Sequence, residues 1–402
     1  MIIIPDRIAV GDRYTVLENK AVLIQDKTIK KIAEPADLLR DYPEEPVRSA
    51  QGCTLIPGMI DLHTHLGWGE DPALSGRDCS VSLRALYAGK KMLETLRNGV
   101  TTIRDASSGD GLGVAINEAA SRGWILAPRV FPCLVGICMT GGHGAAASCY
   151  HAVQEVDGIE EMRKAIRRNK KNGASWIKLL SSEGYRGDEL SEEEICFAAE
   201  EAHRLGMKIE VHAGYGASIE SCLAAGVDSI EHGTHLTEEQ GRIMLEKDIT
   251  WVPTIYVFNY VHDEMCVDPN MNTGLGDPSG VFAYLKDCVQ CYPENIVPLH
   301  RMGVRIATGT DTDCTDYTGS APVATECEYL VKCGLKPLEA LECATKNGAD
   351  LLGIGDHIGL VAEGYTADVV LVQGDPSKDI SALHNVCAVY QNGTEIINNF
   401  DA

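Results

Sequence analysis

The sequence of 402 residues carries little positive charge for its length. Lysine and arginine together number 35 against 58 aspartate and glutamate residues, which gives a formal net charge of −23. A chain this acidic lacks the basic surface that a phosphate backbone requires, and anionic membrane surfaces repel it. The composition therefore predicts a protein with neither a nucleic-acid partner nor a membrane partner.

Long apolar runs are also missing from the sequence. No stretch has the roughly eighteen uninterrupted apolar residues of a membrane span, and Met1 to Asp6 show neither the basic nor the apolar region of a secretory signal. The 15 cysteines are an odd number. We read them as scattered core residues, so we expect neither a disulfide framework nor a thiolate zinc site. These features predict a cytoplasmic protein.

The middle of the chain alternates between strand-like and helix-like segments. The length fits a single α/β barrel with a smaller accessory domain. The helix-like segments include Val81 to Asn98, Ile159 to Asn172, Ser191 to Leu205 and Glu238 to Lys247. The strand-like segments are Leu55 to Asp61, Val100 to Arg104, Arg129 to Leu134, Trp176 to Leu180, Lys208 to Val211, Ser229 to Glu231, Thr250 to Pro253 and Val304 to Ala307. This alternation predicts a (β/α)8 TIM barrel, and a doubly wound sheet or two domains are the alternatives.

The two ends of the chain have a different residue pattern from the middle. Short apolar runs separated by turn residues fill both ends, which we read as small antiparallel strands. Each end is too small to fold alone, so we expect the two to pair in one β-sandwich. The predicted parts are 1–56 and 356–402 for the sandwich and 57–355 for the barrel. Asn259 to Pro293 reads as an irregular connection, either a lid or a surface excursion with its own helix.

Two histidines lie two residues apart at the end of the first predicted barrel strand. Residues i and i+2 of a strand share a face, so His63 and His65 can hold one cation between them. The C-terminal ends of barrel strands gather on one face, where other polar residues follow other strands. These are Lys178, His212, His232 and Asp311. Six polar residues that obey one positional rule predict a metal centre on that face.

Lys178 lies among apolar residues, where an ammonium group is costly to bury. One possibility is that its side chain extends to solvent. The other is that the neutral amine takes up carbon dioxide and becomes a carbamate, an anionic ligand able to bridge two metals. The four histidines and one aspartate on the same face favour the carbamate, because an ammonium group would face the cations.

The pattern resembles the amidohydrolase superfamily, in particular its binuclear members with a carboxylated lysine. The resemblance rests on Lys178 and on segments 57–65, 99–105, 211–213, 230–233, 309–311, 349–353 and 364–371. The most similar subgroup is related to imidazolonepropionase. It includes Xaa-Pro dipeptidases, hydrolases of N-acyl amino acids and ochratoxin-hydrolysing amidases.

The resemblance implies a binuclear centre, with zinc as the expected metal. Two divalent ions would be held, the more buried one by His63, His65 and Asp311 and the more exposed one by His212 and His232, with carboxylated Lys178 bridging both. A metal-bridging hydroxide would attack the amide carbonyl. Asp311 would act as general base and then as general acid.

The resemblance also implies residues that contact the substrate. His143, in Thr140 to Gly144 after the third strand, would polarise the scissile carbonyl. Tyr215 is a candidate for binding a substrate carboxylate, although this chain inserts Gly214 where similar enzymes carry the tyrosine directly after His-Ala. His235 and Asp313 are further loop candidates for substrate contacts.

The implied activity is prolidase-like cleavage of the C–N bond in dipeptides or N-acyl amino acids, by a protein that is also expected to form a homo-oligomer. A first alternative is hydrolysis of a cyclic amide or imidazolone ring. Lys178 argues against it, because the imidazolonepropionase pattern is mononuclear and needs no bridging lysine. A second alternative is a noncatalytic binding protein on a hydrolase fold.

Overall fold

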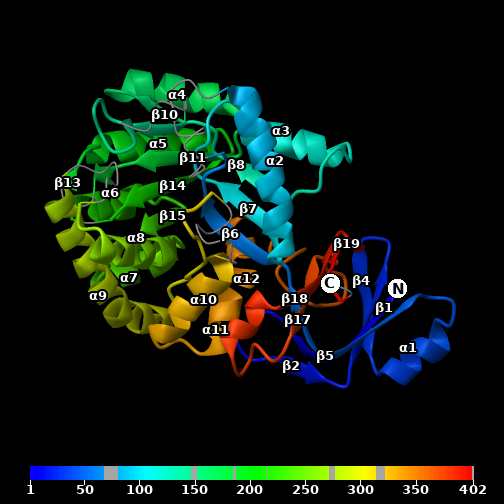
Figure 1. Cartoon of the computed structure of the whole chain (residues 1–402). Coiled ribbons are helices and arrows are strands. Elements are labelled where there is room, and N and C mark those ends of the chain that lie inside the picture. The colour runs from blue at the N-terminus through cyan, green and yellow to red at the C-terminus, as the bar shows by residue number, and fades with distance from the viewer. Residues whose placement is uncertain are drawn as a thin grey trace.

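Parallel strands and helices alternate through the middle of the chain (Figure 1). The computed structural model describes residues 1–67, 80–145, 152–183, 187–214, 216–270, 277–313 and 322–400. One parallel sheet contains β6 (Met59–Thr64), β7 (Val100–Asp105) and β8 (Arg129–Pro132). A second parallel sheet has the order β10 (Val153–Glu155), β9 (Gly136–Cys138), β11 (Trp176–Leu180), β14 (Lys208–Ala213), β15 (Ser229–His232) and β16 (Thr250–Val252).

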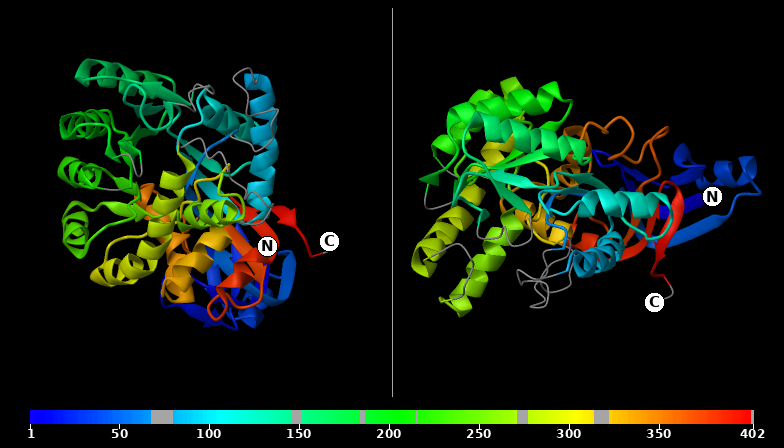
Figure 2. Two further views of the ribbon diagram at one scale, coloured as in Figure 1. Left: turned by 60° about the vertical axis from the view of Figure 1, so that its left-hand side comes forward. Right: turned by 90° about the horizontal axis from the view of Figure 1, so that it is seen from above.

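Helices lie around these strands in all three views (Figures 1 and 2). Two of them begin at capping boxes, Ser191 with Glu194 and Thr237 with Gln240, which satisfy the first free amides of each helix. The helices of this region are α2 (Val81–Arg97), α3 (Leu112–Ser121), α4 (Ile159–Lys171), α5 (Glu192–Arg204), α6 (Ala217–Ala225), α7 (Glu238–Lys247), α8 (Ile255–Val267), α9 (Pro278–Met302), α10 (Pro322–Lys332), α11 (Pro337–Cys343) and α12 (Lys346–Leu351). Among the described residues, none of the helices combines the length and apolarity needed to cross a membrane.

Hydrogen bonds outside the named strands join the edges of the two parallel sheets. The amide of Ser175 donates to the carbonyl of Pro132 at 2.9 Å. On the other side, isolated bridges pair Trp251 with Ile306 and Thr64 with Thr312. The strand predicted over Val304 to Ala307 is thus reduced to one bridge, although this segment still lies between β16 and β6.

Both ends of the chain contribute to one eight-stranded sheet. Figure 2 shows the N-terminal and C-terminal strands side by side, away from most of the helices. Its strands are β1 (Ile2–Ala9), β2 (Val16–Glu18), β3 (Ala21–Gln25), β4 (Thr28–Ala33), β5 (Val47–Pro57), β17 (Val369–Gln373), β18 (Val386–Gln391) and β19 (Thr394–Asn398), with α1 (Pro35–Asp41) and the short 3₁₀ helix η3 (Ile380–His384) between them. The N-terminal strands are not all antiparallel as predicted, because β1 and β5 pair in parallel.

The strand predicted over Leu55 to Asp61 is divided between two sheets. β5 ends at Pro57 in the terminal sheet, and β6 begins at Met59 in the three-stranded sheet. Gly58 separates them, and a Cβ at this position would lie 2.2 Å from Oγ1 of Thr101. Glycine is required here because the backbone passes too close to β7 for any side chain.

The stretch from Asn259 to Pro293 was predicted to be irregular, and this is wrong for most of it. α8 covers its beginning, and α9 runs through Pro293 to Met302. Residues 271–276 lie outside the described part of the chain. The second interpretation, an excursion with helical structure, fits the described residues better than an irregular connection.

Glu326 on α10 is a buried carboxylate that holds the start of α8. Its two oxygens accept hydrogen bonds from the amides of Ile255 at 3.0 Å and Tyr256 at 2.6 Å, which are unpaired donors of the first helical turn. Burial, which outweighs these hydrogen bonds, raises the pKa of Glu326 to about 8. The carboxyl group is therefore neutral in the folded protein at a pH where it is ionised in the unfolded chain.

This raised pKa predicts a loss of stability as the pH rises. The contribution of Glu326 to the free energy of unfolding is largest below its ordinary pKa, and it is lost as the pH rises from there through about 8. The free energy of unfolding should fall by about 1.4 kcal/mol per pH unit across that window, relative to Glu326→Gln. Urea unfolding of both proteins between about pH 5 and about pH 8 measures this difference. Glu246→Gln, on the exposed face of α7, is the control, and equal slopes for wild type and Glu326→Gln would contradict the assignment.

Candidate metal centre

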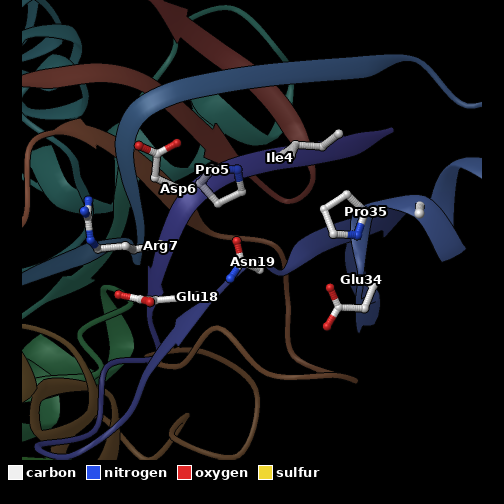
Figure 3. Close-up of a pocket in the computed structure, with 9 residues that line it drawn as sticks. Ile4, Pro5, Asp6, Arg7, Glu18, Asn19, Glu34 and Pro35 are labelled. Carbon is white, nitrogen blue, oxygen red and sulfur yellow. The ribbon is translucent and has the colours of Figure 1, made fainter.

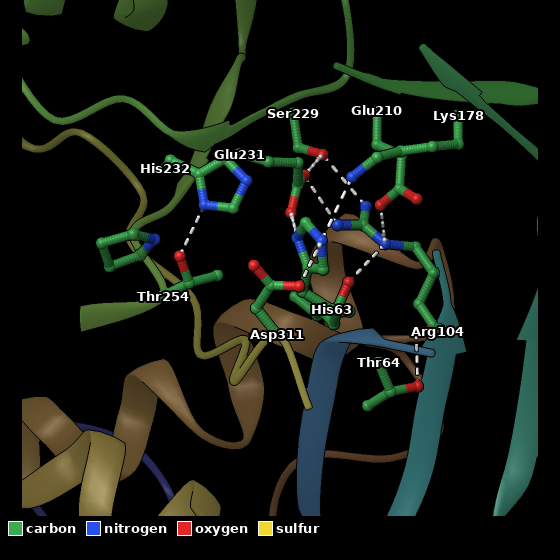
Figure 4. A network of polar contacts seen from close by, with 12 residues as sticks. His63, Thr64, Arg104, Lys178, Glu210, Ser229, Glu231, His232, Thr254 and Asp311 are labelled. Carbon is green, nitrogen blue, oxygen red and sulfur yellow. Dashed lines mark hydrogen bonds and ion pairs between the residues drawn. The ribbon is translucent and has the colours of Figure 1, made fainter. Parts of the chain in front are cut away.

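The six predicted metal ligands lie close together, at or near the C-terminal ends of the strands. Figure 4 shows four of them, His63, Lys178, His232 and Asp311. The ring centroids of His63 and His65 are 5.3 Å apart, and those of His63 and His232 are 5.1 Å apart. His212 lies beside His232, with ring centroids 4.3 Å apart. Lys178 and Asp311 both approach His63, as described below. The positional rule therefore brings together residues from four strands and from the segment after Ile306.

Asp311 contacts both histidines of the first predicted barrel strand, His63 in β6 and His65 just after it. Its Oδ1 atom is 3.0 Å from Nε2 of His65 and 3.5 Å from Nε2 of His63. Burial alone would raise the pKa of Asp311, but nearby His63 and His65 outweigh it and hold the pKa well below its ordinary value. The group is an ionised carboxylate at neutral pH, as a metal ligand or a general base must be.

The Nδ1 atoms of His63 and His65 are each held by a hydrogen-bond acceptor of the protein. Nδ1 of His63 lies 2.8 Å from the Glu231 carboxylate, and Nδ1 of His65 lies 3.2 Å from the carbonyl of Ser107. Because these partners can only accept, each Nδ1 carries the proton and each Nε2 presents a lone pair toward Asp311. A lone pair and a carboxylate oxygen this close require a positive group beside them; in this structure Nζ of Lys178 lies 3.1 Å from Nε2 of His63, and a metal ion would supply that charge for both rings. This is the arrangement in which metal-ligating histidines are held.

Two further histidines extend the set of donors. Nδ1 of His232 lies 2.7 Å from Oγ1 of Thr254. Burial, reinforced by neighbouring positive groups, lowers the pKa of His63, His212 and His232 well below the ordinary value, so the rings are neutral. Nε2 of His212 is buried and has no hydrogen-bond partner among the described residues. Neutral imidazoles with inward lone pairs and one carboxylate suit a divalent transition metal.

Lys178 is 1% exposed, so the alternative that its side chain extends to solvent is wrong. Its Nζ lies 3.1 Å from Nε2 of His63, inside the group of ligands. The lysine therefore lies beside the other predicted ligands. Whether the amine carries carbon dioxide stays a prediction.

Behind His63 lies a buried ion-pair network that sequence reasoning missed (Figure 4). Arg104 of β7 contacts Glu210 at 2.5 Å and Glu231 at 2.7 Å, and its guanidinium lies 4.6 Å from the ring centroid of Trp176. Glu231 in turn accepts from His63. The only signal in the sequence was the presence of charged residues within predicted buried strands, which does not reveal how they pair.

Glu231→Gln should weaken metal binding without unfolding the protein. The amide keeps the shape of the side chain but removes the negative charge that fixes the tautomer of His63. Such outer partners contribute about 10-fold to 100-fold in metal affinity. Competition with a chelator measures the change, and Glu239→Gln, exposed on α7, is the control. Unchanged affinity in Glu231→Gln would show that the contact with His63 does not support a metal.

His143 lies next to the metal-ligand group. Its ring stacks on His212 with centroids 4.3 Å apart. Its backbone amide donates to both oxygens of Glu189 at 2.8 Å, and a Cβ on Gly142 would lie 2.5 Å from that carboxylate. The glycine thus lets Glu189 anchor the loop that carries His143.

The other candidates for substrate contacts are not gathered in the same way. Asp313 is 6% exposed and accepts a hydrogen bond from the hydroxyl of Tyr87 at 2.7 Å, which assigns it a place in the packing of α2. Tyr215 lies outside the described residues, so its predicted role is untested. His235 contacts Asp287 of α9.

Strained backbone marks the same strand ends. His232, Thr254 and Asp311 have φ angles of 68°, 52° and 56°, in the left-handed region that non-glycine residues rarely adopt. Each such residue costs on the order of 1–3 kcal/mol and persists where the surroundings enforce it. The cluster of three around one group of ligands supports a functional site.

A separate open cavity of about 690 Å³ lies on the terminal sheet (Figure 3). Residues such as Arg7, Glu18 and Glu34 line it. It contains none of the predicted site residues, and its side chains form no convergent set of catalytic groups. We therefore assign the chemistry to the strand ends and not to this cavity.

Comparison with known proteins gives similarities along almost the whole chain. A model of the amidohydrolase family matches residues 54–396. Ochratoxinase from Aspergillus niger is 29% identical over 408 residues, covering 93% of this chain and 81% of that protein. Imidazolonepropionase from Clostridium tetani is 24% identical, covering 90% of this chain and 86% of that protein. The crystal structure of a Xaa-Pro dipeptidase with bound methionine in its active site has a TM-score of 0.88 at 26% identity, covering 98% of both chains.

Proposed function

The chain belongs to the amidohydrolase family, and we propose that it is a metal-dependent hydrolase that cleaves the C–N bond of dipeptides or N-acyl amino acids. The family and the similarity to ochratoxinase and to a Xaa-Pro dipeptidase support hydrolysis of a C–N bond. Prolidase-like activity on a small molecule is the first expectation.

The observation that carries this proposal is the convergence of inward-facing donors around Asp311. His63 and His65 present their Nε2 atoms toward a carboxylate whose Oδ1 is 3.5 Å from Nε2 of His63 and 3.0 Å from Nε2 of His65. Together with Asp311, these two residues would hold a more buried ion. His212 and His232 would hold a second, and Lys178 in its carboxylated form would bridge the two. Zinc is the expected metal because imidazole and carboxylate ligands suit it.

Two bound divalent ions would lower the pKa of water and polarise the carbonyl, which is the chemistry that metals supply to hydrolysis. The protein's own residues then handle the proton and orient the substrate. Asp311, an ionised carboxylate, would take a proton from the attacking water and deliver it to the departing amine. His143, beside His212, would donate a hydrogen bond to the carbonyl oxygen as negative charge develops there.

We also propose finer features of the fold. The two parallel sheets would close into a (β/α)8 barrel through the backbone contacts at Pro132, Ile306 and Thr312, which support closure. The eight-stranded terminal sheet would form the β-sandwich domain. A homo-oligomer stays an expectation from the resemblance.

Ring opening is the second candidate, and the similarity to imidazolonepropionase favours it. A cyclic amide presents the same carbonyl to the same groups. Against it stands Lys178, which lies 3.1 Å from Nε2 of His63 although a mononuclear centre needs no bridging residue.

A substrate screen on the zinc-loaded protein separates the two candidates. One panel contains Xaa-Pro dipeptides and N-acyl amino acids, and the other contains hydantoin, lactam and imidazolone rings. We expect hydrolysis in the first panel. Activity confined to the second panel would replace the proposal, and a metal-loaded protein inert toward both would favour a noncatalytic role.

A further inference from the structure

Three residues outside the hydrolytic centre gather where the loop after β15 meets α9. Nitrogen, oxygen and sulfur ligand atoms of His235, Asp287 and Cys291 all lie within 4.8 Å of one another. Asp287 and Cys291 are four residues apart on α9, so both side chains project from one face of the helix. His235 comes from the loop, three residues after the predicted ligand His232.

The hydrogen bonds of His235 define which of its nitrogens faces the cluster. The hydroxyl of Thr234 donates to the carbonyl of Gly214 at 2.5 Å. Its oxygen therefore accepts from Nδ1 of His235, 2.7 Å away. With the proton of the neutral ring on Nδ1, Nε2 directs a lone pair at Oδ2 of Asp287, which is 2.7 Å away. A lone pair and a carboxylate oxygen at this distance repel each other unless a positive charge lies between them.

That positive charge is either a second proton on His235 or a metal ion. A proton would explain the contact between His235 and Asp287 alone. It does not involve Cys291, whose sulfur is the third donor within the same radius. Asp287 and Glu294 surround the thiol with negative charge, an environment that attracts a cation. Nitrogen, carboxylate and thiol donors in one group are a ligand set of zinc and similar borderline ions.

We propose that His235, Asp287 and Cys291 form a second, mononuclear site for a divalent transition metal, separate from the hydrolytic centre. The ion would be coordinated by Nε2 of His235, a carboxylate oxygen of Asp287 and the sulfur of Cys291. On binding it would displace the thiol proton of Cys291 to solvent, so that the sulfur coordinates as a thiolate. The site would connect the loop after β15 to α9, and metal binding would stabilise the folded state through that connection.

The expectation that the cysteines form no thiolate metal site does not account for one pair of them. Cys288 and Cys291 form one C-x-x-C spacing within α9. Cys288 is buried, and burial raises its pKa to about 12, so it remains a thiol inside the helix packing. Cys291 is the member of the pair that faces His235 and Asp287, which is why the spacing alone does not describe the site.

Cobalt(II) tests the proposal because a thiolate ligand gives it an intense near-ultraviolet charge-transfer absorption. The ligands proposed for the hydrolytic centre include no sulfur, so this absorption reports the second site only. We expect wild-type protein titrated with cobalt chloride to show the band, and Cys291→Ser to lose it while keeping hydrolysis. The variant should also bind about one metal ion fewer per chain by elemental analysis. Cys266→Ser, an exposed cysteine whose sulfur lies 3.9 Å from Nε2 of His262, should keep the band.

Two more variants separate this site from the proposed function. Asp287→Asn, with a side chain 59% exposed, should fold normally and require at least about tenfold more cobalt for half-maximal absorption. Lys178→Ala should keep the band even if hydrolysis is lost. Absence of the band in wild type, its persistence in Cys291→Ser or its loss in Cys266→Ser would overturn the proposal, and the first of these outcomes would leave a protonated His235 as the explanation.

Discussion

Replacing Lys178 with alanine should remove about one metal ion per chain and lower kcat/KM for amide hydrolysis by at least about three orders of magnitude. Metal ions contribute several kcal/mol to hydrolytic transition states, and each 1.36 kcal/mol or so is a factor of ten in rate. Lys178 is the only proposed ligand shared by both ions. Its Nζ already lies inside the group, 3.1 Å from Nε2 of His63, so truncation removes the bridge directly. Elemental analysis and steady-state kinetics measure the two effects.

Lys208 provides a matched control for this variant. It lies on the neighbouring β14 at the opposite, N-terminal end of the strand, paired in register with Trp176. Lys208→Ala should therefore retain both metals and hydrolysis. Incorporation of isotope-labelled bicarbonate into wild type, and its absence from Lys178→Ala, would report the carbamate itself. Full activity in Lys178→Ala, or loss of activity with both metals retained, would exclude the carbamate bridge.

The convergence of the proposed ligands was predictable from the sequence because one geometric rule governs them all. Residues at the C-terminal ends of parallel strands meet on one face, and the alternation of apolar segments was enough to locate most of those ends. The strands at Lys178, His212 and His232 lie where the pattern indicated, within one or two residues. Each candidate ligand could be located from the apolar pattern of its own strand alone, without knowledge of its neighbours in space.

The supporting network was not predictable, because it depends on pairs of residues distant in the chain. Glu231 connects His63 to Arg104, and Arg104 connects to Glu210. Each residue alone is a charge inside an apolar strand, which predicts a partner but does not name it. Only the register between strands shows that these partners meet behind the ligands.

Two errors in the predicted elements have local causes. Leu55 to Asp61 is continuously apolar until its end, and the pattern does not show that the chain changes sheets at Gly58. Proline led to the second error, because Pro293 was read as the limit of an irregular stretch. In the structure it lies inside α9, as does Pro298. The packing of this long helix against α8 and α7 stabilises it despite the missing amide donors.

Replacing Asp311 with asparagine tests the proton transfer itself. Asparagine can still contact a cation through its carbonyl oxygen, but it cannot accept a proton at neutral pH. We expect kcat to fall by about 10²-fold to 10⁴-fold, the range for loss of a general base, with a smaller change in KM. Kinetics on the zinc-loaded variant, with its metal content measured in the same samples, separates proton transfer from loss of the metal.

Asp313→Asn is the control for Asp311→Asn. Asp313 is only two residues away and is equally an aspartate, but its side chain accepts a hydrogen bond from Tyr87 of α2 and lies 3.9 Å from Nζ of Lys91 on the same helix. Asp313→Asn should keep kcat within about threefold of wild type, since the contacts it weakens are with α2 and each contributes on the order of 1 kcal/mol to folding. If Asp311→Asn loses kcat while keeping both metals, its carboxylate moves the proton. If it loses kcat only in proportion to lost metal, Asp311 acts as a ligand and another group is the base.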